Sequence, residues 1–207
     1  MDSTATQLVS EATAPSITAL REIGFRGSKR TFYRVSDDRS VIFHVESSRW
    51  NARQHASFTI RLGAYIPEVA KKLRMAILAA PPKSLQGCVW TPDIGRYMSK
   101  QSQQSDWWNI PKDFSVSEAG ADLLHITKTI AIPWFERTIT VDGFCESVLQ
   151  YGTLVSADRL WRLGRKLDAH KCARSELEIT KEIFEGKKYA KVVREWLRAR
   201  PLEASSR

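Results

Sequence analysis

Three segments in the first third of the chain alternate apolar and polar residues at every second position. They are residues 31–35 (TFYRV), 40–46 (SVIFHVE) and 57–66 (SFTIRLGAYI), and all are rich in β-branched and aromatic residues. The stretch SDDRS between the first two has the composition of a turn, which predicts an antiparallel hairpin. Such alternation is typical of an antiparallel sheet with one face buried and the other partly open.

The third segment divides into two sets of side chains. The set expected to face the core contains Phe58, Ile60, Leu62, Ala64 and Ile66. The opposite, open face is expected to carry Thr59, Arg61, Gly63 and Tyr65. In the second segment, Val41, Phe43 and Val45 face one way, and Ile42, His44 and Glu46 face the other.

Helical signals surround these strands. We expect a helix from Pro15 to about Gly24 and another that begins at Pro67. Residues 88–98 (CVWTPDIGRYM) are interrupted by Pro92, which predicts an edge strand or an extended loop. The remainder of the chain is expected to be largely helical.

Several local signals predict where the later helices begin and end. The sequences SVSE (115–118) and SELE (175–178) both have capping-box spacing, which is typical of a helix start. Pro133 predicts a break with a restart, and Gly152 and Gly186 are predicted helix ends.

The order of these elements predicts the fold class. There is no βαβ alternation and no Gly-rich phosphate turn, so we expect an α+β fold: an antiparallel β-sheet packed on helices, followed by a C-terminal helical hairpin. The expected division is a flexible N-terminus over 1–14, an α+β domain over 15–152, a C-terminal helical extension over 153–200 packed on it, and a tail over 201–207.

Composition narrows the class of protein. The 207 residues are 43% hydrophobic and 27% charged, as in an ordinary soluble domain. The three cysteines form no CxxC pair, which argues against a disulfide framework and a zinc knuckle. The start of the chain resembles no secretory signal, and no apolar run is long enough to span a membrane. A cytoplasmic location is the expectation.

Catalytic and cofactor motifs are missing from the sequence. It contains no G-x-S-x-G, P-loop or H-E-x-x-H motif, so it gives little support for an enzyme, and we expect no cofactor. His44 and His55 could be neighbours on adjacent strands. A metal site would then need a third ligand, from Cys88 or Glu46, and a structural or exposed histidine is the expectation.

Four stretches together resemble a known family. They are residues 20–34 (LREIGFRGSKRTFYR), 48–68 (SRWNARQHASFTIRLGAYIPE), 106–110 (DWWNI) and 132–136 (IPWFE), in this order. They resemble the bacterial family of domain of unknown function 4304, over about residues 15–150. The chain departs from the family pattern at Arg61, where asparagine is common, and in CVWTPDIGR. The resemblance implies a fold and a bacterial origin, and it implies no activity.

The charge suggests which partners to consider. The formal net charge is +9 and the isoelectric point is about 9.6, a balance that can favour nucleic acid, anionic lipid or an acidic protein. Arginine and aromatic side chains gather near the predicted strands, and they form our candidate binding surface: Arg30, Tyr33, Arg49, Trp50, Arg53, Arg61, Tyr65, Trp107 and Trp108. The alternative is that helices cover this face and that its arginines pair with acidic residues.

These observations lead to three hypotheses about function. The first is a non-enzymatic bacterial protein that binds a protein partner, in a setting such as a toxin–immunity or phage-defence system. The second is nucleic-acid binding through the basic surface, including the amphipathic stretch 187–200 (KKYAKVVREWLRAR). The third is a hydrolase with an unrecognised site. The oligomeric state is left open.

Overall fold

The computed structural model describes residues 4–52, 55–95, 106–150, 152–181 and 186–202. The chain forms two compact units. We call residues 1–67 and 76–139 the sheet unit, and residues 68–75 and 140–207 the helical unit. The boundary between them falls at residue 139, whereas the sequence suggested residue 152, because α5 (Val141–Gln150) contacts the helices that follow it.

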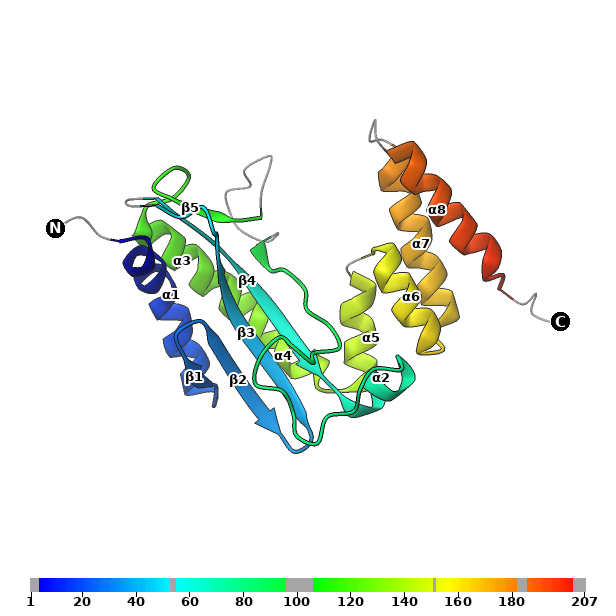
Figure 1. Ribbon diagram of the computed structural model, residues 1–207, viewed down its shortest axis with the longest axis horizontal. Helices are drawn as coiled ribbons and strands as arrows, with labels where there is room; N and C mark the ends of the chain where they lie inside the picture. The colour runs from blue at the N-terminus through cyan, green and yellow to red at the C-terminus, as the bar shows by residue number, and fades with distance from the viewer. Residues whose placement is uncertain (1–3, 53–54, 96–105, 151, 182–185, 203–207) are drawn as a thin grey trace. The chain divides into compact units, whose positions relative to one another are not determined.

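The sheet unit is built on one antiparallel sheet (Figure 1). Its five strands lie in sequence order and are β1 (Arg26–Ser28), β2 (Thr31–Ser36), β3 (Arg39–Ser47), β4 (Ala56–Tyr65) and β5 (Trp108–Ile110). The predicted hairpin is β2–β3, in which Phe32 pairs with Phe43, and Phe43 pairs in turn with Leu62 of β4. The predicted α+β fold with an antiparallel sheet is confirmed.

Helices cover one face of this sheet. α1 (Ala5–Glu22) and α3 (Val116–Ile126) pack side by side, and α1 also contacts β4 (Figure 1). The side chains of Phe43, Ile60 and Leu62 point to this face and are at most 1% exposed. Burial of these apolar side chains is the main stabilising contribution to the sheet unit.

α4 (Ile132–Thr138) completes the covered face. Its Phe135 ring lies 4.9 Å from the ring of Phe25. α3 starts at the predicted capping box of Ser115 and Glu118. A π-helical turn over Thr127–Ala131 separates α3 from α4 and ends two residues before Pro133, which agrees with the predicted break.

An extended segment, residues 76–95, covers part of the other face. The Leu78 N–H donates a hydrogen bond of 2.9 Å to the Tyr65 hydroxyl, and the Ser40 hydroxyl donates one of 2.8 Å to the Pro82 carbonyl. Farther along, Trp90 and Asp93 form isolated bridges with the edge of β4. Of the two alternatives, an edge strand or an extended loop, the structure shows an extended loop. It is hydrogen-bonded to β4 at separate points.

α1 begins ten residues earlier than the sequence suggested. The side chain of Thr4 accepts a hydrogen bond from the Gln7 N–H, and Gln7 returns one, so that a capping box starts the helix at Ala5. Val9 and Ala12 are buried. Residues 5–14 therefore form a docked helix rather than the flexible N-terminus expected over 1–14. Pro15 lies inside α1.

The helical unit contains α2 (Pro67–Lys72) from Glu68 onward and, among its described residues, four further helices. These are α5 (Val141–Gln150), α6 (Leu154–Arg162), α7 (Lys166–Lys181) and α8 (Gly186–Ala199). α7 packs against both α6 and α8, so the predicted C-terminal helical hairpin is α7–α8 (Figure 1).

Two predicted helix boundaries in this unit are wrong. α7 runs through SELE (175–178), because the residues before it already form a helix with buried Ala169, Cys172 and Ala173. Gly186 begins α8 and does not end the preceding helix. Among the described residues, no helix is long and apolar enough to cross a membrane.

Candidate functional site

The open face of the sheet carries a chain of paired polar side chains. Arg61 of β4 forms an ion pair with Glu46 of β3 across the strands. Next to this pair, the Thr31 hydroxyl and His44 Nδ1 lie 2.9 Å apart, within hydrogen-bond distance. The Arg61 side chain is 46% exposed, yet its charge is matched by Glu46. Such a pair leaves little net charge to attract a polyanion.

Burial and neighbouring charges shift the pKa of two groups on this face. Burial lowers the pKa of His44, Arg30 and Arg61 lower it further, and Glu46 opposes the shift. His44 is therefore mainly neutral at pH 7.

Burial also raises the pKa of the Asp93 carboxyl. Hydrogen bonds of 2.8 Å donated by the Thr59 hydroxyl and by the Gly95 N–H oppose that rise.

Two aromatic members of the candidate surface lie in the core. Tyr65 is 1% exposed because segment 76–95 covers it, and its hydroxyl is held by Leu78. Trp108 is 0% exposed, stacks on Phe58 with ring centres 5.4 Å apart, and donates a hydrogen bond to Asp122. The alternation of β4 correctly placed Tyr65 on the face opposite the helices. It could not show that segment 76–95 covers Tyr65 there.

The other candidates are scattered. Trp50 is 79% exposed in the loop between β3 and β4, and the Arg49 guanidinium lies 4.9 Å from its ring centre. Arg30 is exposed and lines a hollow of about 430 Å³ beside α1. Tyr33 and Trp107 are half-buried, and Arg53 lies outside the described residues.

The histidines and cysteines give no metal site or nucleophile in the described part of the chain. His44 pairs across the strands with Arg61, and His55 is exposed beyond the end of that pairing. No three His, Cys, Asp or Glu residues among those described come together to hold a metal ion. All three cysteines are buried, and burial raises the pKa of the Cys88 thiol to about 12, too high for a thiolate at neutral pH.

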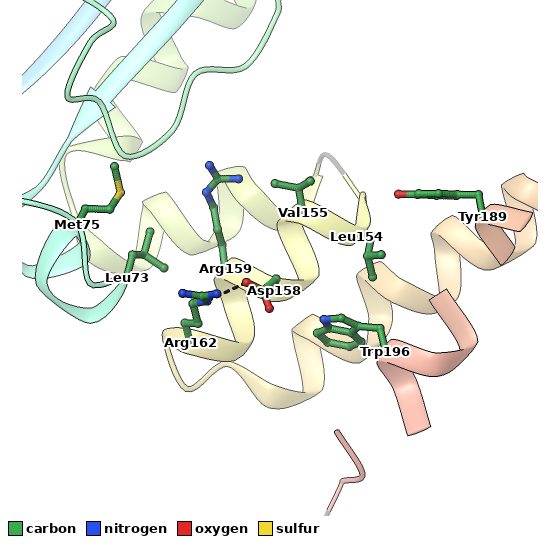
Figure 2. Close-up of a pocket in the computed structure, with 9 residues that line it drawn as sticks. All are labelled: Leu73, Met75, Leu154, Val155, Asp158, Arg159, Arg162, Tyr189 and Trp196. Atoms are coloured by element: carbon green, nitrogen blue, oxygen red, sulfur yellow. Dashed lines mark hydrogen bonds and ion pairs between the residues drawn. The ribbon is translucent and has the colours of Figure 1, made fainter. Parts of the chain in front are cut away.

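The helical unit contains a pocket that the candidate surface did not include (Figure 2). Its volume is about 530 Å³, within the range of ligand pockets. Figure 2 shows two aromatic side chains at one end, two side chains from the turn after α2 at the other, and residues of α6 between them. We call it the apolar pocket, and its lining is Leu73, Met75, Leu154, Val155, Asp158, Arg159, Arg162, Tyr189 and Trp196.

The charged residues of the apolar pocket come from one helix, α6. Asp158 Oδ2 accepts a hydrogen bond of 2.8 Å from Arg162 Nε one turn later (Figure 2). Its other oxygen accepts one of 3.2 Å from Arg200 Nη2. Burial lowers the pKa of the Arg159 guanidinium, and the positive charge of Arg162 adds to this shift, whereas Asp158 opposes it. The three charged side chains of the pocket together carry one excess positive charge.

The aromatic end of the pocket is held by neighbours on α7 and α6. The rings of Trp196, Trp161 and His170 contact one another in pairs, with ring centres 5.9 Å apart for Trp161 and His170 and 6.0 Å apart for the two pairs that include Trp196. The Arg200 guanidinium lies 4.7 Å from the Trp196 ring centre. Burial raises the pKa of the Tyr189 hydroxyl, and Glu176 adds to the rise by its charge and a hydrogen bond.

Part of this site was visible in the sequence. The amphipathic stretch 187–200, considered above for nucleic-acid binding, includes Tyr189 and Trp196 among its apolar residues. The sequence did not single out Val155, Arg159 and Arg162 as pocket residues. Helical periodicity shows which residues share a helix face, but not whether the rest of the protein covers that face completely. Val155 is 57% exposed.

Comparison with known proteins identifies the sheet unit. The family model described as Domain of unknown function (DUF4304) matches residues 17–137. The chain belongs to the DUF4304 family. The resemblance inferred from the four sequence stretches is thereby confirmed. No curated protein and no solved structure matches the chain.

The DUF4304 match has a clear relation to the two units. It contains the five strands, α2, α3, all of α4 except Thr138 and only the last third of α1, and it ends two residues before the sheet unit does. Seven of the nine residues of the apolar pocket follow residue 137. The pocket is thus largely a feature of the chain beyond the part that the DUF4304 model describes.

Proposed function

We propose that this DUF4304 protein binds a protein partner, and that the apolar pocket of the helical unit receives an acidic amphipathic helix of that partner. The observation that carries the proposal is the composition of the pocket. Six of its nine described lining residues are apolar or aromatic, and the charged ones are two arginines and one aspartate. An apolar floor with a cationic rim fits a helix that has leucine-like residues on one face and carboxylates beside them.

Exposure supports this occupant. Val155 and Tyr189 are 57% and 39% exposed, and Met75 is 38% exposed. These side chains share one pocket, so they form a connected apolar surface rather than single exposed residues. Covering them with apolar side chains would remove this surface from water, and each fully buried large side chain contributes about 1.5–3 kcal/mol.

Charge supports an acidic partner. The helical unit has seventeen Lys or Arg residues against eleven Asp or Glu, a net charge of +6 out of +9 for the chain. Such an excess accelerates association with an acidic protein and disfavours a basic one. In the sheet unit, Arg61, Arg34 and Arg39 are each ion-paired with a carboxylate, as Arg162 is with Asp158 in the pocket. That the partner belongs to a toxin–immunity or phage-defence system stays a prediction.

The test uses the full-length chain and two labelled synthetic peptides. One is a helical peptide of about four turns with leucines along one face and glutamates elsewhere. The other has lysine in place of each glutamate. Fluorescence anisotropy should show saturable binding of the acidic peptide and about tenfold weaker binding or none for the basic one. Equal binding of the two peptides would show that charge does not select the partner.

The substitution Val155→Glu locates the binding site. It places a charge on the pocket wall at the second residue of α6, where helices tolerate acidic residues. Leu167→Glu is the matched control: Leu167 is 67% exposed, is the second residue of α7, and is not among the described lining residues. We expect Val155→Glu to weaken binding of the acidic peptide about tenfold or more, and Leu167→Glu to change it less than about threefold. Equal effects would place the peptide elsewhere.

A further inference from the structure

A second hollow in the helical unit has a different chemical character. Its volume is about 370 Å³, and the described residues that line it are Lys72, Arg74, Asp158, Trp161, Arg162 and Arg200. We call it the cationic hollow. Four of its six residues are Lys or Arg, and one is acidic. It shares Asp158 and Arg162 with the apolar pocket, but the remaining residues differ.

The two arginines on the α6 and α8 side are held in place. Arg162 and Arg200 bind opposite oxygens of Asp158, at 2.8 and 3.2 Å. His170 Nε2 lies 2.6 Å from the Arg200 carbonyl, which fixes the chain at the end of α8. One carboxylate thus gathers two guanidinium groups and neutralises only one of their charges. Ordered guanidinium groups lose little freedom when they bind an anion.

On the α2 side of the hollow, Arg74 has an unfavourable backbone conformation. Arg74 has φ +59, in the left-handed region, where glycine is the usual residue. The turn is closed by hydrogen bonds from the Arg74 N–H to the Lys71 carbonyl and from the Met75 N–H to the Ala70 carbonyl. The end of α2 favours positive charge, but this does not explain why Arg162 and Arg200 face the same hollow.

From these observations we infer that the cationic hollow binds a chain of two or three phosphate groups. Lys72, Arg74, Arg162 and Arg200 against Asp158 leave an excess of three positive charges. A single phosphate dianion would leave part of that charge unmatched, whereas a di- or triphosphate balances it and offers oxygens to several donors at once. Arginine binds such oxygens with paired, charge-assisted hydrogen bonds. Inorganic polyphosphate and nucleotides both carry such a phosphate chain, and the recognised group is the same in both.

The experiment titrates the full-length chain by calorimetry with inorganic phosphate, tripolyphosphate and ATP at low salt. We expect tripolyphosphate to bind at least about tenfold more tightly than inorganic phosphate. ATP binding equal to tripolyphosphate assigns recognition to the phosphate chain alone, and tighter ATP binding adds a contact with the nucleoside. Failure of both to bind overturns the inference. Binding of single-stranded DNA without binding of tripolyphosphate also overturns it, in favour of a nucleic-acid surface.

Charge-matched variants separate the hollow from the general positive charge. The double substitution Lys72→Glu with Arg74→Glu should weaken tripolyphosphate binding about tenfold or more. The control, Lys191→Glu with Arg194→Glu, makes the same change in net charge at exposed positions of α8. It should change binding less than about threefold. Equal losses in both variants would show a diffuse electrostatic effect and overturn the inference.

Two further variants complete the test of tripolyphosphate binding. Should the double glutamate variant fail to fold, Arg74→Gly removes one charge and suits the backbone at φ +59. It should weaken tripolyphosphate binding about threefold or more, and unchanged affinity would contradict the site. Val155→Glu lies in the apolar pocket and outside the described lining of the hollow, and should leave tripolyphosphate binding within about threefold. This result distinguishes the hollow from the proposed peptide site.

Discussion

At the scale of single residues, Arg74 combines an unfavourable backbone conformation with a position among other cations. In the part of the chain that the structure describes, Arg74 is one of three non-glycine residues with positive φ, together with Lys29 and Asp37. Lys29 and Asp37 lie in the turns between β1 and β2 and between β2 and β3. Arg74 closes α2 instead, where glycine would be the ordinary choice. An arginine that holds an unfavourable conformation beside three other cations points to a role in binding.

The substitution Arg74→Gly should therefore separate stability from binding. Relief of the left-handed conformation should raise the free energy of unfolding by about 0.5–1 kcal/mol, after the greater flexibility of glycine in the unfolded chain is subtracted. Urea unfolding measures this change. The same variant should bind tripolyphosphate more weakly. A loss of stability would show that the Arg74 side chain makes contacts that outweigh its backbone strain.

His44 should make stability depend on pH. Its folded pKa is lowered from 6.5, first of all by burial and then by Arg30 and Arg61. The unfolded chain thus binds a proton more readily than the folded chain. The contribution is fully present above pH 6.5 and is lost as the pH falls toward the lowered folded pKa. The free energy of unfolding of His44→Gln should therefore decrease less than that of the wild type between pH 7.5 and pH 5. Parallel pH profiles would contradict the assignment.

At the scale of elements, the fit between β4 and segment 76–95 decides how the open face of the sheet is covered. A Cβ atom at Gly63 would lie 2.8 Å from Cys88 Sγ and 2.9 Å from a methyl carbon of Leu85. Both distances are shorter than a normal contact. The absence of a side chain at Gly63 therefore lets the segment approach the sheet closely.

The substitution Gly63→Ala should overpack this contact and lower the free energy of unfolding by about 1–3 kcal/mol. Cys88→Ala removes the sulfur atom on the other side. In the double variant, the cost of Gly63→Ala should fall by about 0.5 kcal/mol or more relative to the wild-type background. Chemical unfolding of the wild type, the two single variants and the double variant measures these free energies as a double-mutant cycle. Additive costs would mean that the segment does not rest on Gly63.

The elements also show what a sequence reveals and what it leaves out. The strands were predictable because their alternation continues over many residues, and the start of α3 was predictable because the Ser115 capping box has no helical residues before it. The same pattern at Ser175 lies inside α7, because the residues before it are already helical and four residues with capping-box spacing do not interrupt them. The burial of Tyr65 depends on Leu78 and its neighbours, which a period-two pattern in β4 does not reveal.

At the scale of the whole molecule, the chain joins a DUF4304 sheet unit to a basic helical unit, and the two candidate sites with the clearest chemistry lie in the second. The sequence analysis took the arginine and aromatic residues near the strands as the candidate binding surface. The stated alternative, that arginines near the sheet pair with acidic residues, describes Arg61, Arg34 and Arg39. Ion pairs between residues far apart in sequence require the folded arrangement, so charge counting alone cannot distinguish a paired arginine from a binding one.

Peptide anisotropy on the wild type, Val155→Glu and Leu167→Glu tests the central claim most directly. The account predicts that the acidic amphipathic peptide binds the wild type and Leu167→Glu with similar affinity, and that it binds Val155→Glu about tenfold more weakly or not at all. Circular dichroism should show the same helical content in all three proteins. Undiminished binding to a folded Val155→Glu protein would contradict the claim that the apolar pocket receives the partner.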